Sequence, residues 1–202
     1  MFNRRIWWWF TALGVAATSG PFPCVAQERD TTYSLVLYAG GGFTRNLTKW
    51  DPPLPGLKKT GFGGFVRVMW HPEHLLSVGL ETGFAQVYYV AVDNMQTPFG
   101  ETDYSSYLSV VPLELAFSMP IIGHLQGYIG STSFFMFSRT ESFGNTAKGF
   151  ALSIGFTAGL SYLWPINEKW ALGCELKWYH IEKTWDDNMM AYVLFSYRFL
   201  EW

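Results

Sequence analysis

Few residues in this 202-residue sequence have types and spacings that could support chemistry. His180 and Glu182 share a strand face two residues apart, but no His-x-Ser element accompanies them, so we interpret them as interfacial residues. His71 and His74 flank a Pro-Glu pair, which is more typical of a solvated turn than of a metal site. Residues 185–188 (Trp-Asp-Asp-Asn) carry oxygen ligands of the kind that calcium prefers, although a polar loop tip is the simpler interpretation. The sequence therefore predicts no catalytic residue, no metal site and no cofactor, and we do not expect an enzyme.

A second set of charged residues occurs on segments whose neighbouring positions are small. The set comprises Arg67, Glu81, Glu114, Glu175, Lys177 and Arg198. Three are cationic and three anionic, and buried charges are costly unless they are paired. Folding the last two segments about Asp186 and Asp187 predicts Glu175 opposite Arg198 and Lys177 opposite Ser196. Folding 76–88 and 107–117 about their connecting loop in the same way places Glu81 near Glu114. This like-charged pair needs a cation, and Arg67 on the neighbouring segment is the candidate.

The elements that carry these charges belong to an unusual composition. Charged residues make up 15% of the chain, aromatic residues 19% and hydrophobic residues 49%, with a formal net charge of −2. A basic nucleic-acid-binding protein is excluded because it would show a clustered positive footprint. Disorder is excluded by the hydrophobic content. Because soluble domains contain about 25% charged residues, the low charge indicates that something other than water faces much of the surface.

The N-terminal residues predict export. Arg4 and Arg5 precede an uncharged, mostly apolar stretch over 6–18, and a small-x-small signal ends at Ala26, just before Gln27. We predict a signal peptide over 1–26 and a mature domain over 27–202. An uncleaved anchor and lipoprotein processing at Cys24 are the alternatives. Removal of Cys24 leaves Cys174 without a disulfide partner, so we expect it to be a small apolar residue on a strand.

Two uncharged stretches, residues 115–138 and 149–167, would be predicted by hydropathy alone to be transmembrane helices. Their periodicity contradicts that interpretation. From Phe150 to Trp164, large apolar residues alternate with small or polar ones, which is the period of a strand. The run is longer than an ordinary globular strand and suits a membrane-spanning strand. Comparable runs predict eight strands: 33–43, 61–70, 76–88, 107–117, 125–137, 150–164, 170–181 and 190–200.

The connections between these strands alternate in length. Short turns are expected at 71–74, 118–124 and 165–169, and longer polar loops at 44–60, 90–106, 138–148 and 182–189. An even strand number with short turns at one end and long loops at the other is the plan of an outer-membrane barrel. The predicted fold class is all-β: an eight-stranded antiparallel up-and-down transmembrane β-barrel. A secreted sandwich or lipocalin-like barrel is the alternative, but the apolar faces are too uniformly bulky for a small interior.

Aromatic residues near the predicted strand ends complete the pattern, since such barrels carry girdles at both membrane interfaces. The expected girdle residues are Trp70, Tyr88, Tyr107, Trp164, Trp170 and Trp178.

The segment Tyr107-Leu108-Ser109-Val110-Val111-Pro112-Leu113-Glu114-Leu115, followed by Gly127-Tyr128-Ile129-Gly130, carries a family likeness. It resembles the outer-membrane β-barrel domain of Bacteroidetes that includes PorT-like proteins, with one extra residue before Pro112. The terminal Tyr197-Arg198-Phe199 is similar to the aromatic ending of such barrels, and the architecture is similar to that of OmpA-, OmpX- and OmpW-type barrels. The resemblance implies an outer-membrane location and is nearly silent on function.

Two function classes therefore remain. The first is a structural or interaction protein, an envelope component or a subunit of a surface or secretion assembly, acting through long extracellular loops. The second is a small channel for small or apolar solutes, which the filled interior of an eight-stranded barrel disfavours. The expected partners are outer-membrane lipid, the barrel-assembly machinery and proteins that contact the loops, but not nucleic acid.

Overall fold

The computed structural model describes residues 33–48, 56–72, 75–97 and 100–202. The predicted signal peptide and its cleavage position between Ala26 and Gln27 lie outside these residues. The described part of the chain forms nine strands: β1 (Ser34–Asn46), β2 (Leu57–Lys58), β3 (Thr60–His71), β4 (Ser77–Thr97), β5 (Gly100–Ile122), β6 (Leu125–Ser142), β7 (Asn145–Pro165), β8 (Trp170–Ile181) and β9 (Asp186–Glu201). Of the two stretches that hydropathy alone would make helical, 115–138 lies in β5 and β6 with a turn at 123–124, and 149–167 lies mainly in β7. No helix of the described residues is long and apolar enough to cross a membrane.

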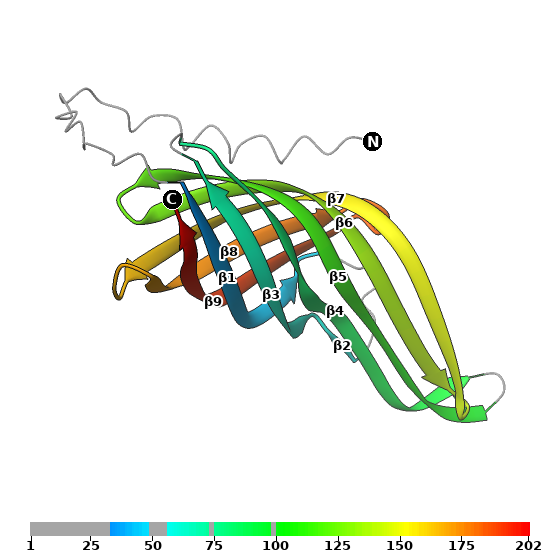
Figure 1. Cartoon of the computed structure of the whole chain (residues 1–202). Helices are drawn as coiled ribbons and strands as arrows, with labels where there is room; N and C mark the ends of the chain where they lie inside the picture. Colours follow the sequence, from blue (N-terminus) through cyan, green and yellow to red (C-terminus); the bar gives the residue numbers. More distant parts are fainter. Residues whose placement is uncertain (1–32, 49–55, 73–74, 98–99) are drawn as a thin grey trace, which may run out of the picture. The chain divides into compact units, whose positions relative to one another are not determined.

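The eight long strands form one closed antiparallel ring (Figure 1). Each pairs with its neighbour along the chain, β1 pairs with both β3 and β9, and the two-residue β2 adds to β4. Closure matters because a sheet edge in lipid would leave backbone N–H and C=O groups without partners. The prediction of an eight-stranded up-and-down barrel is confirmed.

The ring closes with a stagger. Following paired residues once round the barrel from Leu35 leads back to β1 at Arg45, ten residues further along. Such a stagger tilts the strands by about 35–45° from the barrel axis, and eight strands leave an interior just wide enough for side chains. The lumen is therefore a packed core.

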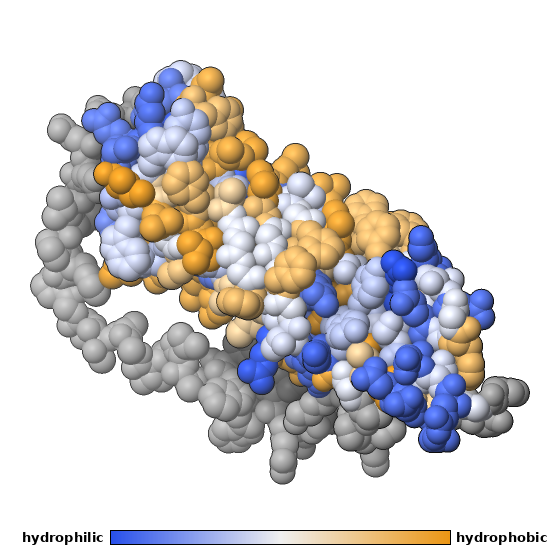
Figure 2. Space-filling model, turned by 90° about the horizontal axis from the view of Figure 1, so that it is seen from below, coloured by the Kyte–Doolittle hydropathy of each residue, from blue (hydrophilic) through white to orange (hydrophobic). Residues whose placement is uncertain are grey.

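Alternation along the strands separates the lumen from the outer wall. On β7, Ser153, Thr157 and Ser161 are buried, whereas Ile154 and Leu160 are exposed. Figure 2 shows apolar side chains spread over the outer wall, with hydrophilic residues gathered toward the two ends. A polar interior with an apolar outer band is the pattern of a barrel that faces lipid.

Two of the predicted long loops are strands, and this part of the prediction is wrong. β4 and β5 stay paired as far as Thr97 and Gly100, and β6 and β7 as far as Ser142 and Asn145. The β6–β7 connection is a two-residue turn, Phe143–Gly144, with positive φ at both residues, as type I′ hairpins require. These hairpins extend beyond the rest of the barrel as a four-stranded sheet (Figure 1), which we call the protruding sheet.

Candidate functional site

The middle of the lumen holds a cluster of charged side chains contributed by four strands. Register places Arg67 on β3 opposite Glu81 on β4, and Glu81 opposite Glu114 on β5. Glu175 and Lys177 enter from β8, two residues apart and therefore on the same face. All five are at most 4% exposed. We call these five residues the lumen network.

Arg67 is the centre of the lumen network. Its Nε donates to Glu81 Oε2 at 2.7 Å, while Nη1 and Nη2 donate to the two oxygens of Glu175 at 3.0 and 2.8 Å. A bidentate guanidinium–carboxylate pair is both strong and geometrically specific. Lys177 Nζ donates to Glu81 and lies 3.8 Å from Glu114 and 3.7 Å from Glu175. Each cation thus bridges more than one strand.

Aromatic rings enclose the two cations. The guanidinium carbon of Arg67 lies 4.4 Å from the ring centroid of Tyr128 and 4.8 Å from that of Phe65. Lys177 Nζ lies 4.6 Å from the same Phe65 ring. The Tyr128 hydroxyl donates to Glu175 at 3.1 Å. Cation–π contacts of this kind are strongest where water is excluded, so the rings both stabilise the charges and fill the lumen.

The sixth residue predicted for this cluster lies elsewhere. Arg198 is near the barrel end where Tyr33 and Trp202 pair, its side chain is 42% exposed, and it pairs with Glu201 at 3.3 Å. The predicted pairing of Glu175 with Arg198 is also wrong, because Glu175 lies opposite Tyr192 and Lys177 opposite Met190. The turn between β8 and β9 is centred three residues earlier than predicted, which moves each partner by six residues.

Most of the aromatic residues predicted for the girdles lie on the outer wall. Trp70, Trp164 and Trp170 mark the barrel end where Tyr33 and Trp202 pair, and Trp170 stacks on Tyr197 with ring centroids 4.0 Å apart. Trp178 lies toward the other end of β8 and packs edge-on against Phe156. Tyr107 is half-buried on β5, opposite Arg139.

Tyr88 requires a correction. A bulge between Gln86 and Tyr88 shifts the register of β4 against β5. A bulge adds one residue and so reverses which face the following side chains occupy. Tyr88 consequently packs against the buried interior cluster and is not part of a lipid-facing girdle.

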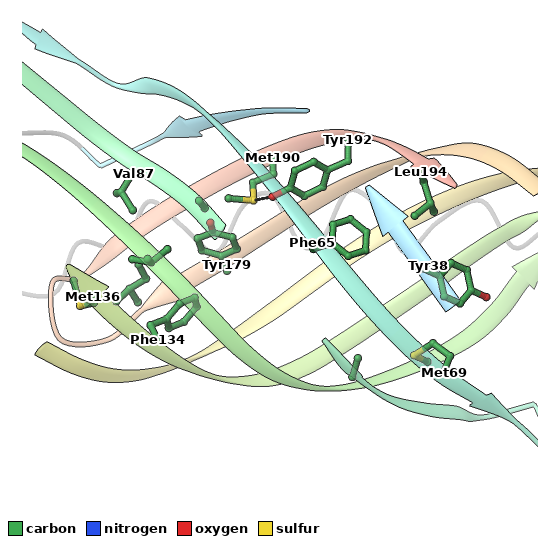
Figure 3. Close-up of a cluster of buried hydrophobic side chains, with 14 of the residues drawn as sticks. Tyr38, Phe65, Met69, Val87, Phe134, Met136, Tyr179, Met190, Tyr192 and Leu194 are labelled. Carbon is green, nitrogen blue, oxygen red and sulfur yellow. Dashed lines mark hydrogen bonds between the residues drawn. The ribbon is translucent and has the colours of Figure 1, made fainter. Parts of the chain in front are cut away.

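Bulky residues also occupy the interior, which the sequence predicts to be mainly small with scattered charges. Figure 3 shows Phe65, Phe134, Tyr179 and Tyr192 within one buried cluster. The ring centroids of Phe134 and Tyr179 are 5.4 Å apart, and those of Phe65 and Tyr192 are 5.1 Å apart. Glycines make room for such rings, since a Cβ on Gly159 would come within 2.7 Å of three Tyr128 side-chain atoms. The sequence does contain a signal for these interior rings. Phe65 lies two residues from Arg67 on β3, so the alternation of a strand places both side chains on the same face.

Two of the histidines first weighed for catalysis or metal binding, His71 and His180, have ordinary partners, and His74 lies outside the described residues. His71 contacts the hydroxyls of Tyr38 at 3.0 Å and Ser77 at 2.7 Å, at the end of β3. His180 Nδ1 lies 2.9 Å from Asp187. Among the described residues, no group of three or more His, Cys, Asp or Glu side chains could hold a metal ion. Cys174 is free and exposed on the outer face of β8.

The protruding sheet has an open edge along β7. β8 pairs with β7 only from Gly155 onward, whereas β6 pairs with β7 from Asn145. Residues 145–152 therefore have no strand beside them on their second side in the described part of the chain; we call them the β7 edge. The edge begins beside a notch of about 300 Å³ lined by Leu152, Ser153, Ile154, Glu182 and Lys183.

No family model matches this sequence, and no curated protein matches it. Its fold does have counterparts among solved structures. A major outer membrane protein from Thermus thermophilus is similar with a TM-score of 0.59 and 17% identity, covering 83% of this chain and 99% of that chain. The fold is that of an outer-membrane β-barrel. Ail of Yersinia pestis has a TM-score of 0.46 with 13% identity (85% and 98% covered), and Neisserial surface protein A a TM-score of 0.44 with 11% identity (84% and 97% covered).

Proposed function

We propose that this chain is a non-catalytic outer-membrane barrel with a closed lumen, which docks an extended protein segment on its protruding sheet. The lumen network carries the first half of the proposal. Arg67, Lys177 and the rings of Phe65 and Tyr128 occupy the middle of a lumen that has room only for side chains. A steady channel for solutes would have to break several buried ion pairs, so the interaction role is favoured over the channel role.

The β7 edge carries the second half. The C=O of Ile154 accepts from Glu182 N–H and so points away from β6. Because backbone groups alternate sides along a strand, the N–H and C=O of Leu152, Phe150, Lys148 and Thr146 also point to the open side. These groups are a template for a further strand, which is the β-augmentation mode of peptide recognition. Phe150 and Leu152 are each more than half exposed, so apolar side chains at alternate positions of the segment would match them.

In this proposal the barrel end where Tyr33 and Trp202 pair faces the periplasm, and the protruding sheet faces outward. Labelling of single cysteines on intact cells tests the orientation. A cysteine at Asn145, in the β6–β7 hairpin, is expected to react, and one at Glu168, in the β7–β8 turn, is not. The reverse result would invert the topology and contradict a surface-docking role.

A photo-crosslinking amino acid at Phe150 tests docking, with the same group at the lipid-facing Phe195 as a matched control. We expect a protein adduct from Phe150 alone. The adduct should disappear with Leu152→Pro, which removes an N–H from the open side while leaving the β6 ladder intact. An adduct that survives Leu152→Pro would contradict strand addition. Steady conductance of the purified protein in planar bilayers would contradict the closed lumen.

A further inference from the structure

The outer mouth of the lumen, away from the network, contains a second polar cluster on the two strands that close the ring. Asn46 on β1 lies directly opposite Asn188 on β9, and Asp186 lies two residues away along β9 on the same face. Asp186 and Asn46 are 2% exposed and Asn188 is 1% exposed. We call these three residues the mouth cluster.

The mouth cluster is incompletely satisfied. Both the Oδ1 and the Nδ2 atoms of Asn188 are buried and have no hydrogen-bond partner. Buried amide groups without partners are uncommon in native structures and require an explanation, such as an ion. This orphaned amide is the observation that separates the mouth cluster from an ordinary group of polar residues.

The carboxylate of Asp186 has no cation beside it in the described part of the chain. It accepts a hydrogen bond from Asn46 Nδ2 at 3.2 Å. The nearby charged residues are engaged elsewhere: Lys59 Nζ donates to the Thr48 carbonyl at 2.5 Å, and His180 pairs with Asp187. Among the described residues, the cluster thus combines a buried carboxylate that has no ion-pair partner with an amide oxygen that accepts no hydrogen bond.

We propose that the mouth cluster binds a calcium ion through the Asp186 carboxylate and the Asn188 amide oxygen, with Asn46 as a positioning residue. Carboxylate and amide oxygens suit hard cations. Calcium accepts irregular sets of six to eight oxygens, whereas magnesium requires a near-ideal octahedron, and waters would complete the calcium shell. With one formal charge among its ligands, the site belongs at the weak end of calcium affinities, at dissociation constants of about 10⁻⁴–10⁻³ M.

The position of the site gives the ion a defined effect. Asn46 and Asp186 belong to β1 and β9, so an ion held by the mouth cluster would strengthen the β1–β9 seam at its outer end. The backbone already ties this end together, because Leu47 N–H donates to the Asp187 carbonyl at 2.7 Å. Because the ion would bind the folded barrel and not the unfolded chain, calcium should raise thermal stability by mass action.

Terbium luminescence of the purified full-length barrel tests the assignment, because Tb³⁺ takes calcium sites and Trp185 adjoins Asp186 as a sensitiser. We expect wild-type protein to bind Tb³⁺, excess Ca²⁺ to displace it, and Ca²⁺ to raise the midpoint of thermal unfolding. Asp186→Asn should weaken Tb³⁺ binding by about tenfold or more, since affinity follows ligand charge. Asp187→Asn is the matched control, because that side chain pairs with His180, and it should bind as wild type does.

Asn188→Asp is a variant that should gain affinity. It adds a second carboxylate to the proposed ligands, so Tb³⁺ should bind about tenfold tighter and calcium should stabilise this variant more than wild type. Circular dichroism checks that each variant is folded. Unchanged binding in both Asp186→Asn and Asn188→Asp, loss of binding in Asp187→Asn, or no Ca²⁺ effect on wild type would overturn the proposal.

Discussion

The lumen network and the protruding sheet share β4 and β5 but satisfy their polar groups in opposite ways. In the lumen, charges from β3, β4, β5 and β8 meet across the barrel, and the backbone of every long strand is paired on both sides. Beyond the point where β8 leaves β7, the sheet continues with an open side. The comparison indicates that backbone pairing is complete where the ring closes and incomplete along one side of β7 beyond that point.

The largest effect is expected from breaking the lumen network at its centre. Arg67→Met leaves Glu81 and Glu175 with less compensation in a buried site, and should cost about 3–5 kcal/mol of unfolding free energy. Urea unfolding of the refolded barrel, followed by tryptophan fluorescence, measures it. Arg139→Met is the control, because its pair with Glu141 is more than 40% exposed on both sides, and it should cost far less than Arg67→Met. Similar losses for the two variants would contradict the distinction between the two regions.

A smaller loss is expected from crowding the network. A Cβ on Gly159 would come within 2.7 Å of three Tyr128 side-chain atoms, so Gly159→Ala must move the ring away from Arg67 and Glu175. Overpacking of this kind costs about 1–3 kcal/mol. Gly41→Ala is the matched change, because its nearest atom would be 3.8 Å away. The same unfolding assay compares the two glycines, and equal stability would show that the ring has room to move.

Shortening the protruding sheet should leave the barrel nearly unchanged. Replacing residues 141–146 with Asn-Gly keeps the Thr140–Ala147 pair and supplies the residues that a two-residue hairpin prefers. Because the lumen network is untouched, we expect a stability change within about 1 kcal/mol, as for other substitutions away from the core. The crosslink from Phe150 should weaken. A barrel that fails to fold after this change would show that the protruding sheet is part of the stable core.

The smallest effect concerns Arg198, and it checks the corrected register. Because Arg198 pairs with Glu201 and Glu175 pairs with Arg67, Glu175→Gln and Arg198→Ala should be additive within about 0.5 kcal/mol. Glu175→Gln combined with Arg67→Met should not be additive, since the two side chains share a bidentate contact. A double-mutant cycle for each pair provides the measurement. Coupling between Glu175 and Arg198 would contradict the register of β8 against β9.

Alternation is sufficient to predict the strands and the lumen-facing parity of residues such as Arg67 and Lys177, because one face meets lipid and the other does not. It fails where this contrast disappears. Residues 90–106 are richer in polar residues and lack a regular alternation, which predicts a loop, although 90–97 and 100–106 form paired strands. The bulge before Tyr88 leaves no mark in the hydrophobic pattern, so the pattern cannot show that the Tyr88 side chain points inward. The position of the β8–β9 turn leaves no mark either, so the pattern cannot identify the residue opposite Glu175. The sequence shows Asp186 and Asn188 as oxygen ligands in a polar tip, but it cannot show their neighbour Asn46, which is far away along the chain.

The seam between β1 and β9 also constrains how the barrel can fold. Tyr33 and Trp202 exchange backbone hydrogen bonds of 3.0 Å in both directions, across almost the whole described chain. Contacts between residues so distant in sequence form slowly, because a long loop must close before they contribute. β1 cannot acquire its second neighbour until Asp186–Glu201 has been synthesised and delivered, so the ring cannot close during translation. The sheet must instead remain open, with β1 as an unpaired edge, until the last strand arrives, and we expect this closing step to limit the folding rate.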